Sequence, residues 1–290
     1  QGDGSIGSKL ISFDHISGVA FTGSSATAKK INLQLAKKDG PISSLIAETG
    51  GLNAMFIDSS SLHEQVVDDI MRSSFNSAGQ RCSALRLAII HESIFDDLVE
   101  MIKDAMAELT VGNPEDFHCD VGPIIDERSR NMLLEYISEC SNNGYQVFSH
   151  NQAPDGNFVS PTLIELNSID DINEEKFGPI LHVIKYKTDE LDQILNALKN
   201  KQYGLTMGVH SRIESKADDI INKSIAGNTY INRDIVGAVV GSQPFGGTGL
   251  SGTGFKAGGP NYLLQFVDER SITKNTVAFG GNAEILNLED

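Results

Sequence analysis

Apolar positions along the chain follow two spacings, one typical of buried strands and one typical of amphipathic helices. Short apolar runs predict strands over residues 16–21, 42–47, 54–58, 85–90, 145–148, 158–166, 180–186, 205–210 and 229–231. Helical spacing predicts helices over residues 25–35, 59–75, 93–109, 126–142, 191–199 and 214–224. Because strands and helices alternate, the pattern predicts an α/β protein with a mostly parallel sheet covered on both faces. The first strand, with Val19 and Phe21, is expected to be buried.

Glycine-rich segments interrupt this alternation in two places. Residues 2–7 fit GxGxxG and precede a short helix from Ser5, whose N-terminal N–H groups would suit a phosphate. Residues 237–259 hold too much glycine for a helix or strand and too many apolar residues for a disordered linker. This segment is expected to be an ordered, closely packed loop. A short helix over 261–267, an edge strand over 272–279 and an acidic tail are expected after it.

Composition excludes several classes of function. The 290 residues suffice for about two domains, and 40% hydrophobic with 21% charged residues is typical of soluble globular proteins. A net charge of −16 argues against nucleic acid or an anionic membrane as a partner. No apolar run approaches the roughly 18–20 residues that span a bilayer. Three cysteines without CxxC spacing favour the cytoplasm, and no HxxxH spacing indicates a metal site.

Cys82 is the strongest candidate for chemistry. It lies in the stretch FNSAGQRCSALR, between a predicted helix and a predicted strand, among small and polar neighbours. Such a turn leaves room for a substrate, and its backbone N–H groups can lower a thiol pKa and bind a developing oxyanion. The alternative is a structural cysteine, because free cysteines are among the most buried residues. Cys140, on the apolar face of a predicted helix, is expected to be such a core residue.

Other polar residues occupy turns beside predicted strands. Gly23 and Ser24 form a turn before a helix that Ser24 can cap, which is either an anion site or an ordinary strand-to-helix turn. Glu48 ends a strand just before two glycines and is a candidate general base, or else a solvated carboxylate. Glu175 and Phe177 lie in a rigid Pro-containing turn that either faces a ligand or is simply a solvated acidic turn.

Five motifs together resemble the aldehyde dehydrogenase superfamily over essentially the whole chain. They occur in the family's order: FTGS at 21–24, ETGG at 48–51, GQRC at 79–82, EEKFGP at 174–179 and PFGG at 244–247. A narrower resemblance is to the glutamate-semialdehyde (pyrroline-5-carboxylate) dehydrogenase module of the bifunctional proline utilization A (PutA) flavoenzymes. Four segments carry it: FNSAGQRCSALR, INRDIVGAVVGSQPFGG, LSGTGFKAGGPNY and NTVAFGGNAEILNL.

This resemblance implies the chemistry of an NAD-dependent oxidation of L-glutamate γ-semialdehyde to L-glutamate. Cys82 would attack the aldehyde carbon, and Glu48 would activate the water that hydrolyses the resulting thioester. The residues implied for NAD are Gly23 and Ser24 at the pyrophosphate, Glu175 at the nicotinamide ribose and Phe177 at the nicotinamide pocket. Those implied for the substrate are Ser83, Gly237 and Ala238 at its carboxylate and Phe245 at its aliphatic chain.

The resemblance also implies an aldehyde dehydrogenase-like catalytic domain joined to the remnant of a Rossmann-like NAD-binding domain. Residues 1–48 would be that remnant, 49–250 the catalytic domain, and 251–290 a segment returning to the cofactor domain and ending in a tail that forms a homo-oligomer. A longer protein is expected, with FAD only in an upstream domain. These 290 residues alone are expected to be inactive. The alternatives are a dehydrogenase for another semialdehyde, such as succinate semialdehyde, or a non-catalytic folding or dimerisation unit.

Overall fold

The computed structural model describes residues 1–149, 153–275 and 278. Its largest element is a seven-stranded sheet in the order β10-β9-β3-β4-β7-β6-β5, in which every pair is parallel except β5 with β6. The strands are β3 (Ala54–Ile57), β4 (Leu87–His91), β5 (Gln146–Phe148), β6 (Thr162–Glu165), β7 (Ile180–Tyr186), β9 (Thr206–His210) and β10 (Asn228–Ile231). The predicted mostly parallel α/β fold is confirmed.

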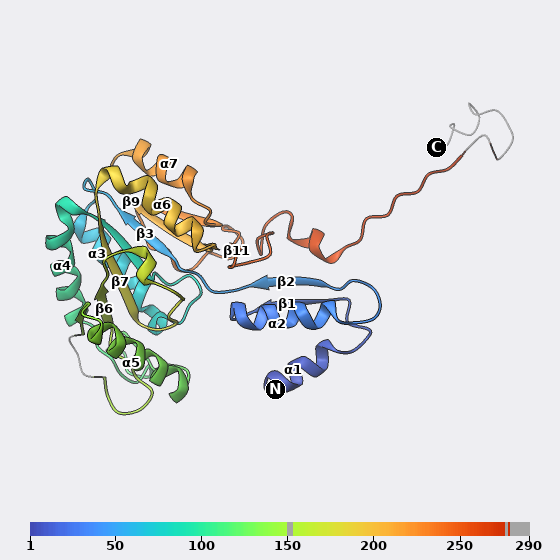
Figure 1. Cartoon of the computed structure of the whole chain (residues 1–290), viewed down its shortest axis with the longest axis horizontal. Coiled ribbons are helices and arrows are strands. Elements are labelled where there is room, and N and C mark those ends of the chain that lie inside the picture. Colours follow the sequence, from blue (N-terminus) through green and yellow to red (C-terminus); the bar gives the residue numbers. More distant parts are fainter. Residues whose placement is uncertain (150–152, 276–277, 279–290) are drawn as a thin grey trace.

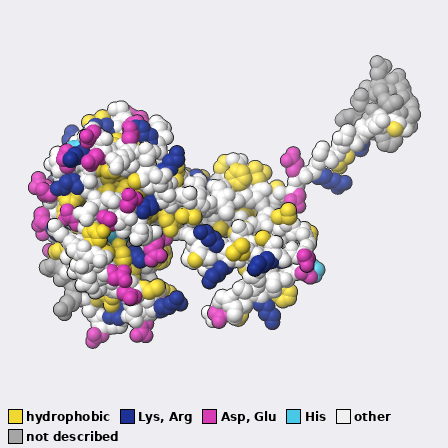
Figure 2. Space-filling model, viewed as in Figure 1, with side chains coloured by type: hydrophobic (Ala, Val, Ile, Leu, Met, Phe, Trp, Pro, Cys, Tyr) yellow, Lys and Arg dark blue, Asp and Glu magenta, His cyan; other side chains and the backbone are white. Residues whose placement is uncertain are grey.

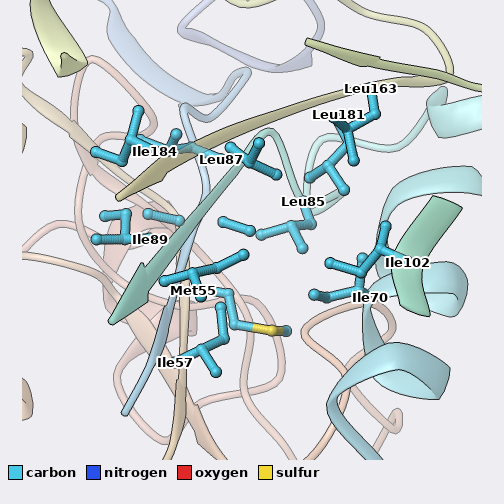
Figure 3. Packing of buried hydrophobic residues seen from close by; sticks show 14 of the residues in the cluster. Met55, Ile57, Ile70, Leu85, Leu87, Ile89, Ile102, Leu163, Leu181 and Ile184 are labelled. Atoms are coloured by element: carbon cyan, nitrogen blue, oxygen red, sulfur yellow. The ribbon is translucent and has the colours of Figure 1, made fainter. Parts of the chain in front are cut away.

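Helices cover both faces of this sheet (Figure 1). They are α3 (His63–Phe75), α4 (Phe95–Ala107), α5 (Glu127–Asn142), α6 (Leu191–Asn200) and α7 (Glu214–Lys223). Figure 3 shows Ile70 of α3 and Ile102 of α4 beside Met55 and Leu85, all fully buried. Leu195 of α6 is buried too. The apolar runs predicted as central strands are therefore buried from both sides, as parallel strands usually are.

A second, smaller sheet lies beside the main body. It pairs β1 (Gly18–Thr22) in parallel with β2 (Ser44–Glu48), and α1 (Gly4–Ile11) and α2 (Ser25–Ala36) belong to the same region (Figure 1). The prediction of a buried first strand was wrong, because Val19 and Phe21 are only half-buried. With two strands and one helix packed along them, this sheet has too few described neighbours to enclose its side chains.

The glycine-rich loop is ordered, as predicted. Within it, β11 (Thr248–Gly249) pairs with β8 (Tyr203–Gly204), and Phe245 forms an isolated bridge with Ala257. The 3₁₀ helix η5 (Tyr262–Phe266) follows, and the chain then leads away from the body (Figure 1). Residues 272–275 form no strand, so that part of the edge-strand prediction was wrong. The rest of that segment except residue 278, and the proposed oligomerisation tail, lie outside the described residues.

The surface shows where charge and apolar side chains gather. Figure 2 shows acidic and basic groups interspersed over the visible face of the main body. Large apolar side chains are exposed on the smaller region, including Leu10, Leu33 and Ile42. Within the part of the chain that the structure describes, no helix combines the length and the apolar character that a membrane crossing needs.

Two histidines and Cys140 are buried away from the cavity. His182 is buried and its ring nitrogens lie 2.8 Å from the Tyr136 hydroxyl and 2.8 Å from the Arg86 carbonyl, which satisfies both. Cys140 is buried in the core, as predicted. His210 is buried too, with Nε2 3.5 Å from Asp69 Oδ2. None of the three lines the cavity described below.

Candidate active site

One cavity of about 1040 Å³ lies where the two sheets meet. The carboxyl ends of β1 and β2 face it from one side, and the loops before β4 and β7 face it from the other. All ten residues singled out from the sequence line it: Gly23, Ser24, Glu48, Cys82, Ser83, Glu175, Phe177, Gly237, Ala238 and Phe245. The thiol and the candidate base therefore share one cavity, although different sheets carry them.

A strained turn leads into Cys82. After α3, the 3₁₀ helix η1 (Asn76–Gly79) places Ser77, Ala78 and Gly79 in succession at φ 55°, 53° and 64°, in the left-handed region that non-glycine residues rarely adopt. At Gly79 a side chain would also collide, because an added Cβ would lie 2.1 Å from the Gly178 carbonyl oxygen. Only glycine fits here, which gives the glycine of the GQRC motif a physical reason.

Asn53 holds the turn from behind. Its side-chain Nδ2 donates to the carbonyl oxygens of Cys82, at 2.7 Å, and Ala84, at 2.8 Å. Its Oδ1 accepts from the Thr206 backbone N–H at 3.1 Å, so one buried amide joins the starts of β3, β4 and β9. The sequence analysis missed Asn53, because its partners lie about 30 and 150 residues away.

Arg86 holds the turn from the side. Its guanidinium is 1% exposed and donates to the carbonyl oxygens of Gly79 at 2.7 Å, Arg81 at 3.1 Å and Gly178 at 3.2 Å. Its fourth partner is the Glu175 carboxylate at 3.0 Å. A buried charge is stable only when it is paired and hydrogen-bonded in this way. The sequence does show an arginine within the apolar run that begins β4, which is unusual for a buried strand. The sequence analysis did not use this observation.

The environment of the Cys82 thiol differs from the expectation. Backbone N–H groups of Cys82 and Ser83 do favour the thiolate, as predicted. Burial and the negative charges of Glu175 and Glu48 outweigh them, so the pKa of the Cys82 thiol is raised rather than lowered. The prediction of a lowered thiol pKa was therefore wrong, and a base is needed to form the nucleophile.

Glu48 has the properties of such a base. It is the last residue of β2, and its Oε2 accepts a hydrogen bond of 2.9 Å from the Gly247 backbone N–H. Burial raises the pKa of Glu48 to about 7, against the opposing effects of that hydrogen bond and of the Lys256 charge. A carboxylate with a pKa near neutrality can both accept and release a proton under physiological conditions.

The N-terminus of α2 opens into the cavity beside Gly23. Ser24 caps this helix by accepting a 3.2 Å hydrogen bond from the Thr27 N–H, and the Ser25 and Ala26 N–H groups have no acceptor among the described residues. Free N–H groups at a helix N-terminus suit an anionic phosphate. The other predicted phosphate position, at α1, was wrong, because Asp3 caps that helix with its own carboxylate and the helix does not line the cavity.

Glu175 and Phe177 line the cavity from the loop before β7. Oxygen Oε1 of Glu175 is bound by Arg86, and Oε2 lies so close to Gly50 that an added Cβ there would be 1.7 Å away. Burial raises the pKa of Glu175, and the Arg86 charge opposes that shift. The Phe177 ring lies 5.3 Å from the guanidinium carbon of Arg86 and is 45% exposed. Their contacts with a ligand remain a prediction.

Ser83, next to Cys82 in the chain, and the loop at Gly237 also line the cavity. The Ser83 side chain is 5% exposed, and its hydroxyl has no hydrogen-bond partner among the described residues. Gly237 adopts φ 76°, which favours glycine, and Ala238 follows it. Phe245 is held by two backbone hydrogen bonds to Ala257, at 3.0 and 2.9 Å. Within the described residues, no cluster of His, Cys, Asp or Glu is arranged to hold a metal.

The geometry agrees with the relationship indicated by the motifs. A profile of the aldehyde dehydrogenase family matches residues 1–272. The chain belongs to this family. The bifunctional protein PutA of Klebsiella aerogenes is 45% identical over 276 residues, which cover 91% of this chain and 21% of that protein. The 1-pyrroline-5-carboxylate dehydrogenase of Bacillus subtilis is 34% identical over 283 residues, covering 94% and 54%.

Solved structures of this family have the same fold. A crystal structure of bifunctional proline utilization A matches with a TM-score of 0.91 and 50% identity, over 96% of this chain and 28% of that one. A 1-pyrroline-5-carboxylate dehydrogenase structure matches with a TM-score of 0.85 and 30% identity, over 92% and 52%. This aldehyde dehydrogenase chain thus spans about a fifth of its bifunctional curated relatives and about half of the dehydrogenases.

Proposed function

We propose that this chain supplies the thiol, the base and part of the cofactor site of an enzyme that oxidises L-glutamate γ-semialdehyde to L-glutamate. The observation that carries the proposal is the shared cavity, which brings Cys82, Glu48 and the N-terminus of α2 together. The named relatives, PutA and 1-pyrroline-5-carboxylate dehydrogenase, support the choice of substrate. We further propose that the enzyme is cytoplasmic and that the chain is part of a longer protein.

The first chemical step falls to Cys82. Because burial and two carboxylates disfavour the thiolate, Glu48 accepts the thiol proton and passes it to solvent. The sulfur then bonds to the aldehyde carbon, and the backbone N–H of Cys82 donates to the oxyanion that forms. The Ser83 hydroxyl and the loop at Gly237 hold the substrate carboxylate, because both line the cavity beside the thiol.

The second step releases the acid. NAD, when bound, supplies the acceptor for the hydride that leaves the substrate carbon. Glu48, ionised again, removes a proton from water, which attacks the thioester carbon and frees the Cys82 sulfur. The free Ser25 and Ala26 N–H groups fit a cofactor pyrophosphate. Membership of the family implies NAD or NADP, and we propose NAD, with Ser24, Glu175 and Phe177 as its other contacts.

NADH production by the full-length protein that contains these residues tests the proposal. We expect turnover of L-glutamate γ-semialdehyde, loss of at least about a hundredfold in Cys82→Ala, and normal turnover in the control Cys119→Ala. Full activity in Cys82→Ala would end the proposal. A higher kcat/KM for succinate semialdehyde would keep the reaction and change the substrate. Iodoacetamide labelling of Cys82 no faster than of Cys119 would favour a non-catalytic role.

A further inference from the structure

Lys256 is a partly buried cation beside the cavity wall, and no described carboxylate forms an ion pair with it. Its ammonium donates to the carbonyl oxygen of Gly227, to that of Gly246 at 3.2 Å and to Oδ1 of Asn228 at 3.2 Å. All three acceptors are neutral. Neutral oxygens carry no negative charge that would offset the charge of the ammonium. The positive charge of Lys256 therefore acts on the charged groups near it.

Glu48 is the carboxylate that this field reaches. Gly246 separates the two residues, because a Cβ built on it would lie 2.9 Å from Glu48 Oε1 and 3.2 Å from the Lys256 Cα. Gly247, the next residue, donates its N–H to Glu48 Oε2 at 2.9 Å. One short loop segment therefore touches the base on one side and the lysine on the other, and any side chain at position 246 would force them apart.

The bonds of Lys256 also fix this segment. Asn228 accepts from both the Lys256 ammonium and the Gly246 N–H, at 3.2 Å each, and donates to the Pro244 carbonyl at 2.9 Å. Lys256 thereby joins the start of β10 to the backbone that holds Glu48. Lys256 itself does not line the cavity, so it acts on the base without touching substrate.

We propose that Lys256 is a positioning residue for the general base, keeping Glu48 ionised through its charge and aiming the Gly247 N–H at the carboxylate through its bonds. This inference rests on the proposed function, which assigns Glu48 the role of base. Burial raises the pKa of Glu48 and lowers the pKa of Lys256, and the charge of each group opposes the shift of the other.

The other charged groups around Glu48 cannot replace Lys256. The Cys82 thiol faces the base across the cavity and, when ionised, repels its charge. The Glu175 carboxylate contacts the neighbouring Gly50 and is likewise negative. The Arg86 guanidinium forms an ion pair of 3.0 Å with Glu175, so its charge is already offset. Removing the lysine charge therefore leaves burial to raise the pKa of Glu48, opposed by the hydrogen bond from the Gly247 N–H.

The test follows the pH dependence of both steps that need ionised Glu48 in the full-length protein. In Lys256→Met we expect the rate of the first turnover and the steady-state turnover to show acid limbs that both shift upward by about one pH unit. Turnover should then be about tenfold slower below pH 7 and should approach that of the natural protein near pH 9. Lys256→Arg should restore the natural profile, and Lys223→Met, a surface control, should leave it unchanged.

A second variant keeps the lysine in place. Asn228→Asp puts a carboxylate against the Lys256 ammonium and should shift the acid limb in the same direction, including when Lys256→Met fails to fold. An equal loss of turnover at every pH, or an unshifted limb in both variants, would overturn the inference. If the natural protein forms no NADH from L-glutamate γ-semialdehyde, the proposed function fails instead, so the two failures are distinguishable.

Discussion

Gly79→Ala is the sharpest structural test of how the thiol is positioned. An alanine there must adopt the left-handed backbone at φ 64°, which destabilises the folded state by about 1–2 kcal/mol. The lower entropy of the unfolded chain offsets up to about 1 kcal/mol of this loss. Its Cβ also meets the Gly178 carbonyl oxygen at 2.1 Å, about 1 Å closer than such atoms approach. Overpacking of this kind costs about 1–3 kcal/mol, so we expect a total loss of about 2–4 kcal/mol.

Two other glycines separate these contributions. Gly144 adopts φ 86° with no atom near its Cβ position, so Gly144→Ala measures the backbone effect alone and should cost at most about 1–2 kcal/mol. Gly112 has open space and no positive φ, so Gly112→Ala should be neutral or slightly stabilising. Unfolding of the full-length variants in urea, followed by circular dichroism, gives the three differences on one scale.

The collision also predicts a loss of function that stability alone would not cause. Displacing the Gly178 carbonyl stretches its 3.2 Å hydrogen bond from Arg86, which holds the loops before β4 and β7 together. Turnover in folded Gly79→Ala should therefore fall at least about tenfold, because a small misplacement of reacting groups is costly. If Gly79→Ala matched Gly144→Ala within about 0.5 kcal/mol and kept full turnover, the close packing of this turn would be refuted.

Three further predictions follow from individual side chains. Glu48 works when ionised, so turnover should rise with pH through about 7, and Glu48→Gln should remove that limb and slow turnover at least about a hundredfold. Asn53→Ala leaves the Cys82 carbonyl without its donor and should lower the free energy of unfolding by about 2–4 kcal/mol. The control Asn113→Ala, in an exposed loop, should lower it by less than about 1 kcal/mol, and unfolding in urea measures both. Burial lowers the pKa of His182 to about 4, so the unfolded state binds more protons between pH 6.5 and 4. As the pH falls across that window, His182 should lower the free energy of unfolding by about 3 kcal/mol, and His210, whose pKa burial also lowers to about 4, acts in the same direction. In urea unfolding, His182→Gln should therefore reduce the slope by the share of one histidine.

Local signals were enough to predict much of the fold and to select residues that line one cavity. β7 was predicted with its observed limits, because a short and mostly apolar run between two turns is typical of a buried strand in an α/β protein. Cys82 and Glu48 were found because each lies in a short glycine-containing motif. The prediction for Cys140 succeeded for a similar reason, since helical spacing alone places it on the apolar face.

Interactions between distant segments were beyond that reasoning. Asn53, Arg86 and Lys256 bind the backbone carbonyl oxygens of Cys82, Gly178 and Gly227, which are distant in sequence, and no periodicity in the sequence marks such contacts. The raised pKa of the Cys82 thiol was missed for the same reason: Glu175 and Glu48 are distant in sequence and become neighbours only in the folded chain. The sequence was enough to propose Cys82 and Glu48 as the reactive groups, whereas the shifts of their pKa values depend on tertiary structure.

The division of the reactive pair between two sheets has a consequence for control of the enzyme. Glu48 belongs to the small sheet, and Cys82 lies in the loop before β4 of the large sheet. Thr49 donates hydrogen bonds to the carbonyl oxygens of Ser251, at 2.9 Å, and Leu250, which connect the small sheet to the glycine-rich loop. A slight rotation of one sheet against the other would change the separation of sulfur and carboxylate while leaving each group chemically intact. The rate of turnover would then depend on how the two sheets are oriented. A ligand or subunit that fixes this orientation would activate the enzyme without contacting the cavity.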